Sequence, residues 1–224
     1  RVLCKLAEKF IVSKYDPKLE IKSSYMKLKN FLLKGLSELN LKLANETYYS
    51  TLLVFITSEK HTDIFIFGDG YLKIKYSNKK IVKSFKYSKN APYYLAYDLN
   101  ESDKKMYFDT FKQVLEINST EIINEEKNTQ KSIKEIKENI FYRLENENLI
   151  SVSIMSDGIE SFQDSNKKEI NDLEIVEELT NYKNTNGNFV IRRNKAFLRD
   201  CNKKEITHKD DLSIASIFIE KFSD

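Results

Sequence analysis

The sequence has little of several things that would place a protein in a specialised class. Only two of its 224 residues are cysteines, Cys4 and Cys201, and they lie far apart without a C-x-x-C spacing. This pattern argues against a disulfide framework and favours reduced thiols. No apolar run approaches the ~18 residues that a membrane helix needs, and no signal-peptide pattern is present. We therefore expect a cytoplasmic protein with no membrane partner.

Glycine and proline are also scarce, with 5 and 2 residues, so no flexible linker divides the chain. Hydrophobic residues make up 41% of the sequence and include 14 Phe and 13 Tyr, which is enough for a sizeable core. We expect a single domain that spans residues 1–224.

Neither sign of charge dominates the sequence. Lys and Arg together number 37 and Asp and Glu number 34, so the net charge is only +3 and the signs are interleaved. The segment Lys75–Asn90 is locally basic and aromatic. A solvated hairpin explains that segment more simply than a nucleic-acid-binding or membrane-surface patch does. We therefore expect no nucleic-acid partner.

The first part of the sequence predicts helices. Residues 2–13 are expected to form one helix that ends near Pro17, and residues 23–43 a second, with Ser23 or Ser24 as its N-cap. In the second helix, large apolar residues recur at steps of three and four, which predicts one face against a core. These residues are Tyr25, Leu28, Leu32, Leu36, Leu39 and Leu43.

From Tyr48 the pattern changes to short β-branched and aromatic segments separated by turn residues. Residues 48–57, 62–67, 71–76 and 80–87 are expected to form an antiparallel meander. The stretch TLLVFI is almost entirely apolar and is predicted to be a central strand. The stretch YLKIKY alternates, so one of its faces is expected to be wet.

The second half is predicted to mix strands and helices. Residues 91–128 are expected to be strand and loop pieces, and residues 131–146 a surface helix with apolar residues at helical spacing. A strand is expected at 149–155, and a final strand at 212–220. Between them, residues 171–182 and 187–203 are expected to form helices, the first capped by Asn171 or Asp172.

Acidic residues stand where one predicted strand ends and another begins. If the strands that end at Met155 and start at Leu212 are antiparallel neighbours, Asp157 should meet Asp210 or Asp211 at the same edge of the sheet. Like charges this close repel unless a cation lies between them, and carboxylates suit Mg²⁺ or Mn²⁺. Gly158 would permit a sharp turn after the first strand.

Each acid taken alone also has a structural explanation. An Asp at a strand end often forms a turn or caps the next helix. Asp69 in the stretch FGDGY is typical of a hairpin turn. His208 is close enough in sequence to Asp210 to be a ligand or general acid, but a lone exposed His is more often neither.

The order of these segments resembles the PPM-type (type 2C) metal-dependent Ser/Thr protein phosphatases, in a divergent bacterial branch. The resemblance runs from Thr51 to Phe218. It rests on the Ser-Asp-Gly element at Ser156–Gly158, the Asp-Asp-Leu-Ser element at Asp210–Ser213 and, in support, the Gly-Asp-Gly turn around Asp69. It implies an α+β fold, a sandwich of two antiparallel sheets flanked by helices.

The resemblance also implies a metal centre with two Mg²⁺ or Mn²⁺ ions. Asp157 and Asp210 stand at positions of metal ligands, Asp69 at that of a peripheral ligand, and Asp211 at a position that orients the site. The implied activity is the hydrolysis of phosphoserine and phosphothreonine in a phosphoprotein substrate by a metal-activated water. A partner Ser/Thr kinase system would supply that substrate.

Two departures from the family pattern are present. The Asp-Gly-x-Gly element whose acid bridges both metals is absent, and the chain beginning at Arg1 is expected to lack the family's N-terminal strands. Ser161 stands where many relatives carry a further acid. We therefore do not expect the chain as given to complete a two-metal site. The alternative is an inactive pseudophosphatase that serves as a binding or regulatory module.

Overall fold

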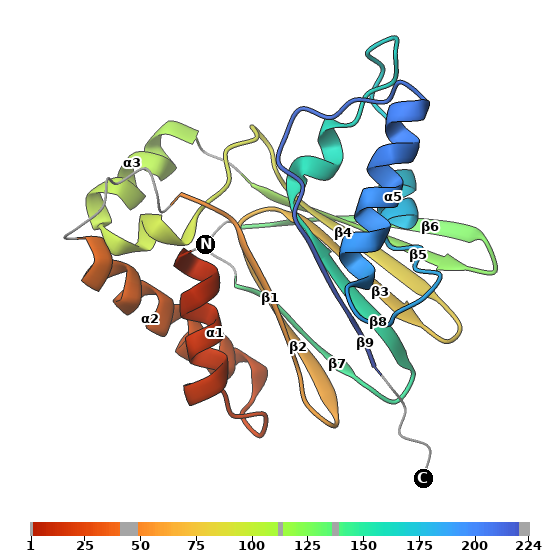
Figure 1. Cartoon of the computed structure of the whole chain (residues 1–224). Coiled ribbons are helices and arrows are strands. Elements are labelled where there is room, and N and C mark those ends of the chain that lie inside the picture. The colour runs from red at the N-terminus through yellow and green to blue at the C-terminus, as the bar shows by residue number, and fades with distance from the viewer. Residues whose placement is uncertain (1, 41–48, 112–113, 136–138, 220–224) are drawn as a thin grey trace. The chain divides into compact units, whose positions relative to one another are not determined.

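The computed structural model describes residues 2–40, 49–111, 114–135 and 139–219. It is an α+β structure with two antiparallel sheets, of three and six strands, and five α-helices in these residues (Figure 1). This confirms the expected class; the face-to-face packing of the sheets and the single domain stay predictions. The contacts divide the chain into two compact units. Unit 1 consists of Arg1–Asp69, Phe85–Ile117 and Ser132–Glu147, and unit 2 of Gly70–Ser84, Asn118–Lys131 and Asn148–Asp224.

Two helices cover the three-stranded sheet of unit 1. Helices α1 (Val2–Lys14) and α2 (Ile21–Asn40) share a core with β1 (Leu52–Thr57) and β2 (His61–Phe67) (Figure 1). The third strand is β7 (Ile140–Glu145). Both predicted helices are confirmed, with ends within about three residues of those expected. The expected apolar face of α2 is buried. Its fully buried residues include Leu28, Leu32 and Leu36, whereas Leu43 lies outside the described residues.

The predicted N-cap of α2 is wrong. The helix begins at Ile21, before both serines, and the Glu20 side chain accepts hydrogen bonds from the Lys22 backbone and the Ser23 hydroxyl, each at 3.4 Å. Ser24 is buried in the first turn. A glutamate therefore takes the role that the pattern assigned to a serine.

The predicted four-stranded meander is also wrong. The order of the three-stranded sheet is β1-β2-β7, so β1 lies at its edge in the described structure and is not the central strand. The central strand is β2, all of whose residues are buried. Its polar residues have cross-strand partners: Thr62 donates to the Asn146 side chain at 2.9 Å, and Asp63 lies opposite Arg143. Since these groups are paired, a strand that reads as half polar can lie at the centre.

The segment 91–128 contains a helix that the sequence did not predict. A 3-10 turn, η2 (Leu95–Leu99), leads into α3 (Glu101–Phe111), and the Asn100 side chain accepts a hydrogen bond from the Ser102 backbone at 2.8 Å. This is the hydrogen bond of an N-cap. The tyrosines in and around these elements pack on one another, which explains why they look like strand residues in the sequence. The rings in contact belong to Tyr49, Tyr93, Tyr94, Tyr97 and Tyr107.

The larger sheet has the strand order β6-β5-β4-β3-β8-β9. These strands are β3 (Gly70–Tyr76), β4 (Lys80–Tyr87), β5 (Leu115–Ile123), β6 (Glu126–Lys134), β8 (Leu149–Met155) and β9 (Ile214–Phe218). The surface helix predicted at residues 131–146 is wrong, because this segment contributes to β6 and β7.

Helices α4 (Asp172–Leu179) and α5 (Phe189–Lys203) share a core with β3 and with η3 (Asp157–Ser161) in unit 2. Asn171 caps α4, as predicted, by accepting from the Leu173 backbone at 2.9 Å. The expected wet face of β3 is wrong at Lys73, which is only 6% exposed. Its ammonium lies 2.7 Å from a carboxylate oxygen of Glu177, so a paired charge occupies that face.

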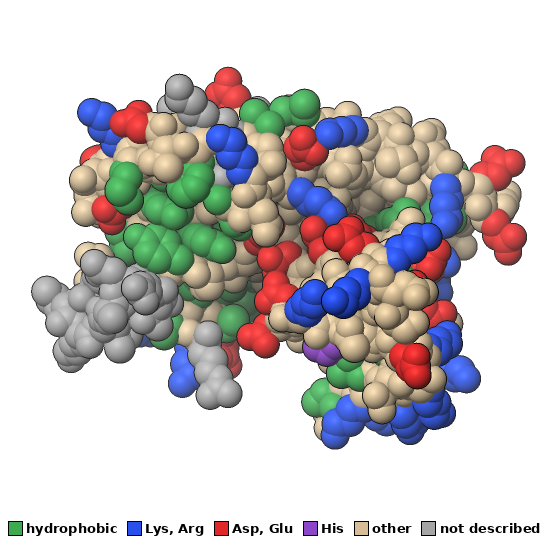
Figure 2. All heavy atoms as spheres, turned by 90° about the horizontal axis from the view of Figure 1, so that it is seen from above, with side chains coloured by type: hydrophobic (Ala, Val, Ile, Leu, Met, Phe, Trp, Pro, Cys, Tyr) green, Lys and Arg blue, Asp and Glu red, His purple; other side chains and the backbone are tan. Residues whose placement is uncertain are grey.

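Two surface properties follow from the described residues. On the face shown in Figure 2, Lys and Arg side chains are interspersed with Asp and Glu side chains, as in the sequence. None of the described helices is long and apolar enough to cross a lipid bilayer.

Candidate metal centre

The pairing of β8 with β9 brings the two acidic segments together. The strands are antiparallel, and their register runs from Ser151 opposite Phe218 to Met155 opposite Ile214. The Ser156 hydroxyl then donates to the Asp211 carbonyl and accepts from the Ser213 backbone, both at 3.0 Å. The predicted arrangement of strand exit beside strand entrance is confirmed.

Gly158 lies against the backbone of Asp211 and Leu212. A Cβ atom at this position would be 2.4 Å from the carbonyl oxygen of Asp211, closer than real side chains come to backbone. The residue is buried in the 3-10 turn that starts at Asp157. The structure thus gives a different reason for this glycine from the sharp turn that the sequence suggested: only a residue without a side chain lets the β9 segment pass.

Ser161 fixes the backbone that carries Asp210. Its hydroxyl donates to the Gly158 carbonyl at 2.8 Å and accepts from the backbone N–H groups of Lys209 and Asp210, each at 3.3 Å. The residue that departs from the family's acidic pattern therefore ties the Asp157 turn to the Asp210 loop. Sequence reasoning missed this role, because a hydroxyl that bonds three backbone groups has no local signature.

The two carboxylates interact electrostatically. Burial, followed by the negative charge of Asp210, raises the pKa of Asp157 above its usual value. Asp210 is exposed, and its carboxylate accepts a hydrogen bond from the Asp211 backbone at 2.7 Å. Among the described residues, neither carboxylate forms an ion pair with a Lys or Arg. The pair is therefore an uncompensated concentration of negative charge.

Asp211 acts through its backbone. Its carbonyl oxygen accepts from Ser156 and lies against Gly158, and the residue is exposed. Its expected role in orienting the site stays a prediction for the side chain. His208 stacks on Phe162 with ring centroids 5.1 Å apart, and its Nδ1 lies 3.2 Å from the Asp210 carbonyl. These contacts support the Asp210 loop and favour a structural role for the histidine.

Asp69 is buried, at 5% exposure, in the connection between β2 and β3. Because these strands belong to different sheets, the connection is not the hairpin that the Asp-Gly pair suggested. Gly68 and Gly70 on either side have φ of +108° and +124°, values that favour glycine. The Thr51 hydroxyl donates to the Asp69 carboxylate. Asp69 belongs to unit 1, whereas Asp157 and Asp210 belong to unit 2, and its role as a peripheral ligand stays a prediction.

The described residues include no group of three or more His, Cys, Asp or Glu side chains arranged to hold a metal ion. Two carboxylates nevertheless fit Mg²⁺ well. This ion usually keeps several waters and takes one or two protein carboxylates, with substrate phosphate oxygens completing its shell. A like-charge pair without a cationic partner is the donor set that such an ion would stabilise. Asp157 and Asp210 could therefore hold one hard divalent cation.

Comparison with protein-family models, with curated proteins and with solved structures finds no match for this chain. The resemblance to metal-dependent phosphatases therefore stays a prediction from the sequence motifs.

The raised pKa of Asp157 predicts how stability changes with pH in metal-free protein. The folded state holds this proton more tightly than the unfolded state, where the pKa is about 3.8. Its contribution to stability is therefore fully present below that value and is lost as the pH rises through the folded-state pKa. Between about pH 4 and pH 7, wild type should lose free energy of unfolding relative to Asp157→Asn. Urea unfolding of both proteins in chelator tests this, and parallel pH profiles would contradict it.

Proposed function

We propose that this chain carries part of the metal centre of a Mg²⁺- or Mn²⁺-dependent phosphoserine/phosphothreonine protein phosphatase. The observation that supports the proposal is the convergence of Asp157 and Asp210, remote in sequence, where β8 leaves and β9 enters the sheet. The ordered motifs supply the reaction class by their resemblance to that family. The proposed partners are a phosphoprotein substrate and the Ser/Thr kinase system that forms it. The two unbridged cysteines support a cytoplasmic location.

The chain's own residues would bind and position the ion. Asp157 and Asp210 would offer carboxylate oxygens, while Ser156 and Ser161 hold the two backbones that carry them. When bound, the metal supplies a nucleophile from water at neutral pH and offsets the charge of the phosphoryl group. Without the metal, two carboxylates would repel a phosphate dianion. Substrate affinity should therefore depend on the cation.

A second candidate is a regulatory binding module without catalysis. The observation that favours it is the lack of a three-ligand group in the described part of the chain. Such a module would keep the fold and the paired loops but bind divalent cations weakly or not at all.

Calorimetric titration of the chain with Mn²⁺ near pH 7 separates the two candidates. The phosphatase proposal predicts binding that Asp210→Asn weakens at least about tenfold, because even residues behind the ligands contribute 10–100-fold. Asp200→Asn is the matched control, since this exposed acid on α5 has only a 3.8 Å contact with Lys203. No binding, or equal binding by wild type and Asp210→Asn, would favour the regulatory module and contradict the phosphatase.

A further inference from the structure

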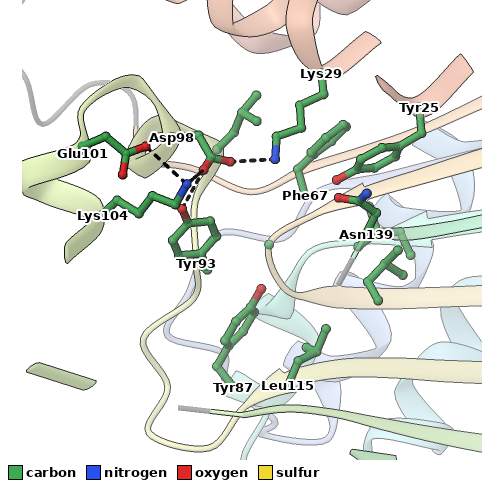
Figure 3. Close-up of a pocket in the computed structure, with 14 residues that line it drawn as sticks. Tyr25, Lys29, Phe67, Tyr87, Tyr93, Asp98, Glu101, Lys104, Leu115 and Asn139 are labelled. Atoms are coloured by element: carbon green, nitrogen blue, oxygen red, sulfur yellow. Dashed lines mark hydrogen bonds and ion pairs between the residues drawn. The ribbon is translucent and has the colours of Figure 1, made fainter. Parts of the chain in front are cut away.

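Unit 1 contains a cavity that the proposed phosphatase function does not use. Its volume is about 440 Å³, within the range of small-ligand pockets, roughly 300–1,000 Å³. Figure 3 shows its aromatic wall, with Tyr25 and Tyr87 projecting toward the cavity from opposite sides. Phe67 and Tyr93 complete the set of rings that line it. A pocket with this many rings suits a flat, unsaturated ligand, because ring faces stack favourably.

The Tyr25 hydroxyl points to a ligand that can hydrogen-bond. The residue is only 4% exposed, and its ring is held by Phe65, Phe67 and Phe141, stacking on Phe67 at 5.0 Å between centroids. Its hydroxyl has no hydrogen-bond partner among the described residues, yet it reaches into the cavity (Figure 3). Burial and the nearby charge of Asp98 raise its pKa, so it remains a neutral donor. The hydroxyl is therefore available to donate a hydrogen bond to a molecule in the cavity.

Asn139 supplies a complementary group beside Tyr25. In Figure 3 the amide of Asn139 lies next to the Tyr25 hydroxyl on the same side of the cavity. Its nitrogen makes only a weak contact with the sulfur of Met26, at 3.8 Å. Its oxygen has no partner in the described structure, so it can accept a hydrogen bond. The wall thus presents a donor and an acceptor to the same edge of a ligand.

The charged wall of the cavity is already neutralised internally. Asp98 lies 2.7 Å from the Lys29 ammonium and 3.3 Å from that of Lys104, which is 3.5 Å from Glu101 (Figure 3). Tyr93 also donates to Asp98 at 2.9 Å. Burial alone would raise the pKa of Asp98, but Lys29, Tyr93 and Lys104 together hold it below its usual value. The two ammonium groups and the two carboxylates are paired with one another. The cavity therefore offers a charged ligand no unpaired group of opposite charge.

We propose that this cavity binds a planar, uncharged nitrogen heterocycle of the nucleobase or nucleoside kind. The polar edge of the heterocycle would bond to the Tyr25 hydroxyl and the Asn139 amide, and its ring would lie among Phe67, Tyr87 and Tyr93. The proposal does not depend on phosphatase activity, because every residue it uses belongs to unit 1 and none is a proposed metal ligand.

Calorimetry of the chain with adenosine, guanosine and uridine tests the proposal. At least one should bind with a Kd below about 1 mM. Tyr25→Phe removes only the hydroxyl and should weaken that binding about 3–10-fold, with a melting temperature equal to or above that of wild type. Tyr182→Phe, in unit 2, loses a 2.7 Å hydrogen bond with Ser216 and should leave nucleoside binding unchanged.

Several results would overturn the assignment. They are the absence of binding by all three nucleosides, equal binding by wild type and Tyr25→Phe, or an equal loss of binding in Tyr182→Phe. Tighter binding of adenosine monophosphate or of choline than of adenosine would also overturn it, because the pocket would then select a charge. Thermal unfolding of each variant verifies that it is folded before its affinity is compared.

Discussion

Arg143→Met should lower the free energy of unfolding by about 3–5 kcal/mol, the usual cost of removing one partner from a buried ion pair. Asp63 is completely buried on the central strand β2, and Arg143 lies directly opposite it on β7. The guanidinium donates hydrogen bonds to both carboxylate oxygens, from Nε and from a terminal nitrogen, each at 2.7 Å. The hydroxyl of Tyr15, the residue after α1, donates to the same carboxylate at 3.0 Å. Without the arginine, the buried carboxylate would keep the Tyr15 hydroxyl as its hydrogen-bond donor, with the His61 imidazole 3.7 Å away.

Urea unfolding near pH 7, followed by circular dichroism, measures this loss. The double variant Asp63→Leu/Arg143→Met should recover much of it, because apolar residues often replace a buried pair without cost. A loss below about 1 kcal/mol, the value typical of surface pairs, would show that the pair contributes little.

Helices α1 and α2 could be predicted because each buries one regular stripe. Leu28, Leu32 and Leu36 recur at four-residue steps and all have no exposed surface, so the periodicity in the sequence corresponds directly to the core. The helix α3 was missed because its best-packed residue, Tyr107, contacts other aromatic rings and not a leucine stripe. Aromatic clusters form in helices and strands alike, so their presence alone does not decide between them.

The strand errors have a common physical cause: long-range pairing overrides local pattern. In the segment 131–146, Ile133 and Ile140 have helical spacing, yet the first is 63% exposed on an edge strand and the second is buried in β7. Since that segment was expected to be a helix, the partner of Asp63 could not be identified. The central position of β2 was missed for the same reason, because the partners of its polar residues are far away in sequence.

More of the candidate site than of the surrounding sheets could be predicted from the sequence. The exit of β8 and the entrance of β9 follow from two apolar runs bounded by acids, and antiparallel pairing then places Asp157 near Asp210. The serines that fix the two loops were not predictable. Both serines bond to backbone groups about fifty residues away, and such contacts leave no trace in local spacing.

Asp157→Asn should lower the Mn²⁺-dependent kcat/KM of the protein on an aryl phosphate at least about 100-fold. Second-shell substitutions at metal centres already cost 10–100-fold, and this one removes the charge of a proposed ligand. The same substitution should preserve or raise the stability of metal-free protein, since it removes a partly buried charge that Asp210 repels. Activity and stability moving in opposite directions would mark a carboxylate kept for function and not for folding.

The double variant makes this prediction sharper. If Asp157 and Asp210 hold the same ion, losing either removes most of the benefit, so Asp157→Asn/Asp210→Asn should be little worse than the worse single variant. Two carboxylates with separate roles would instead give effects that multiply. Asp200→Asn, on α5, controls for the loss of one negative charge and should keep full activity. Turnover that needs no metal, or an unchanged rate in Asp157→Asn, would contradict the proposed chemistry.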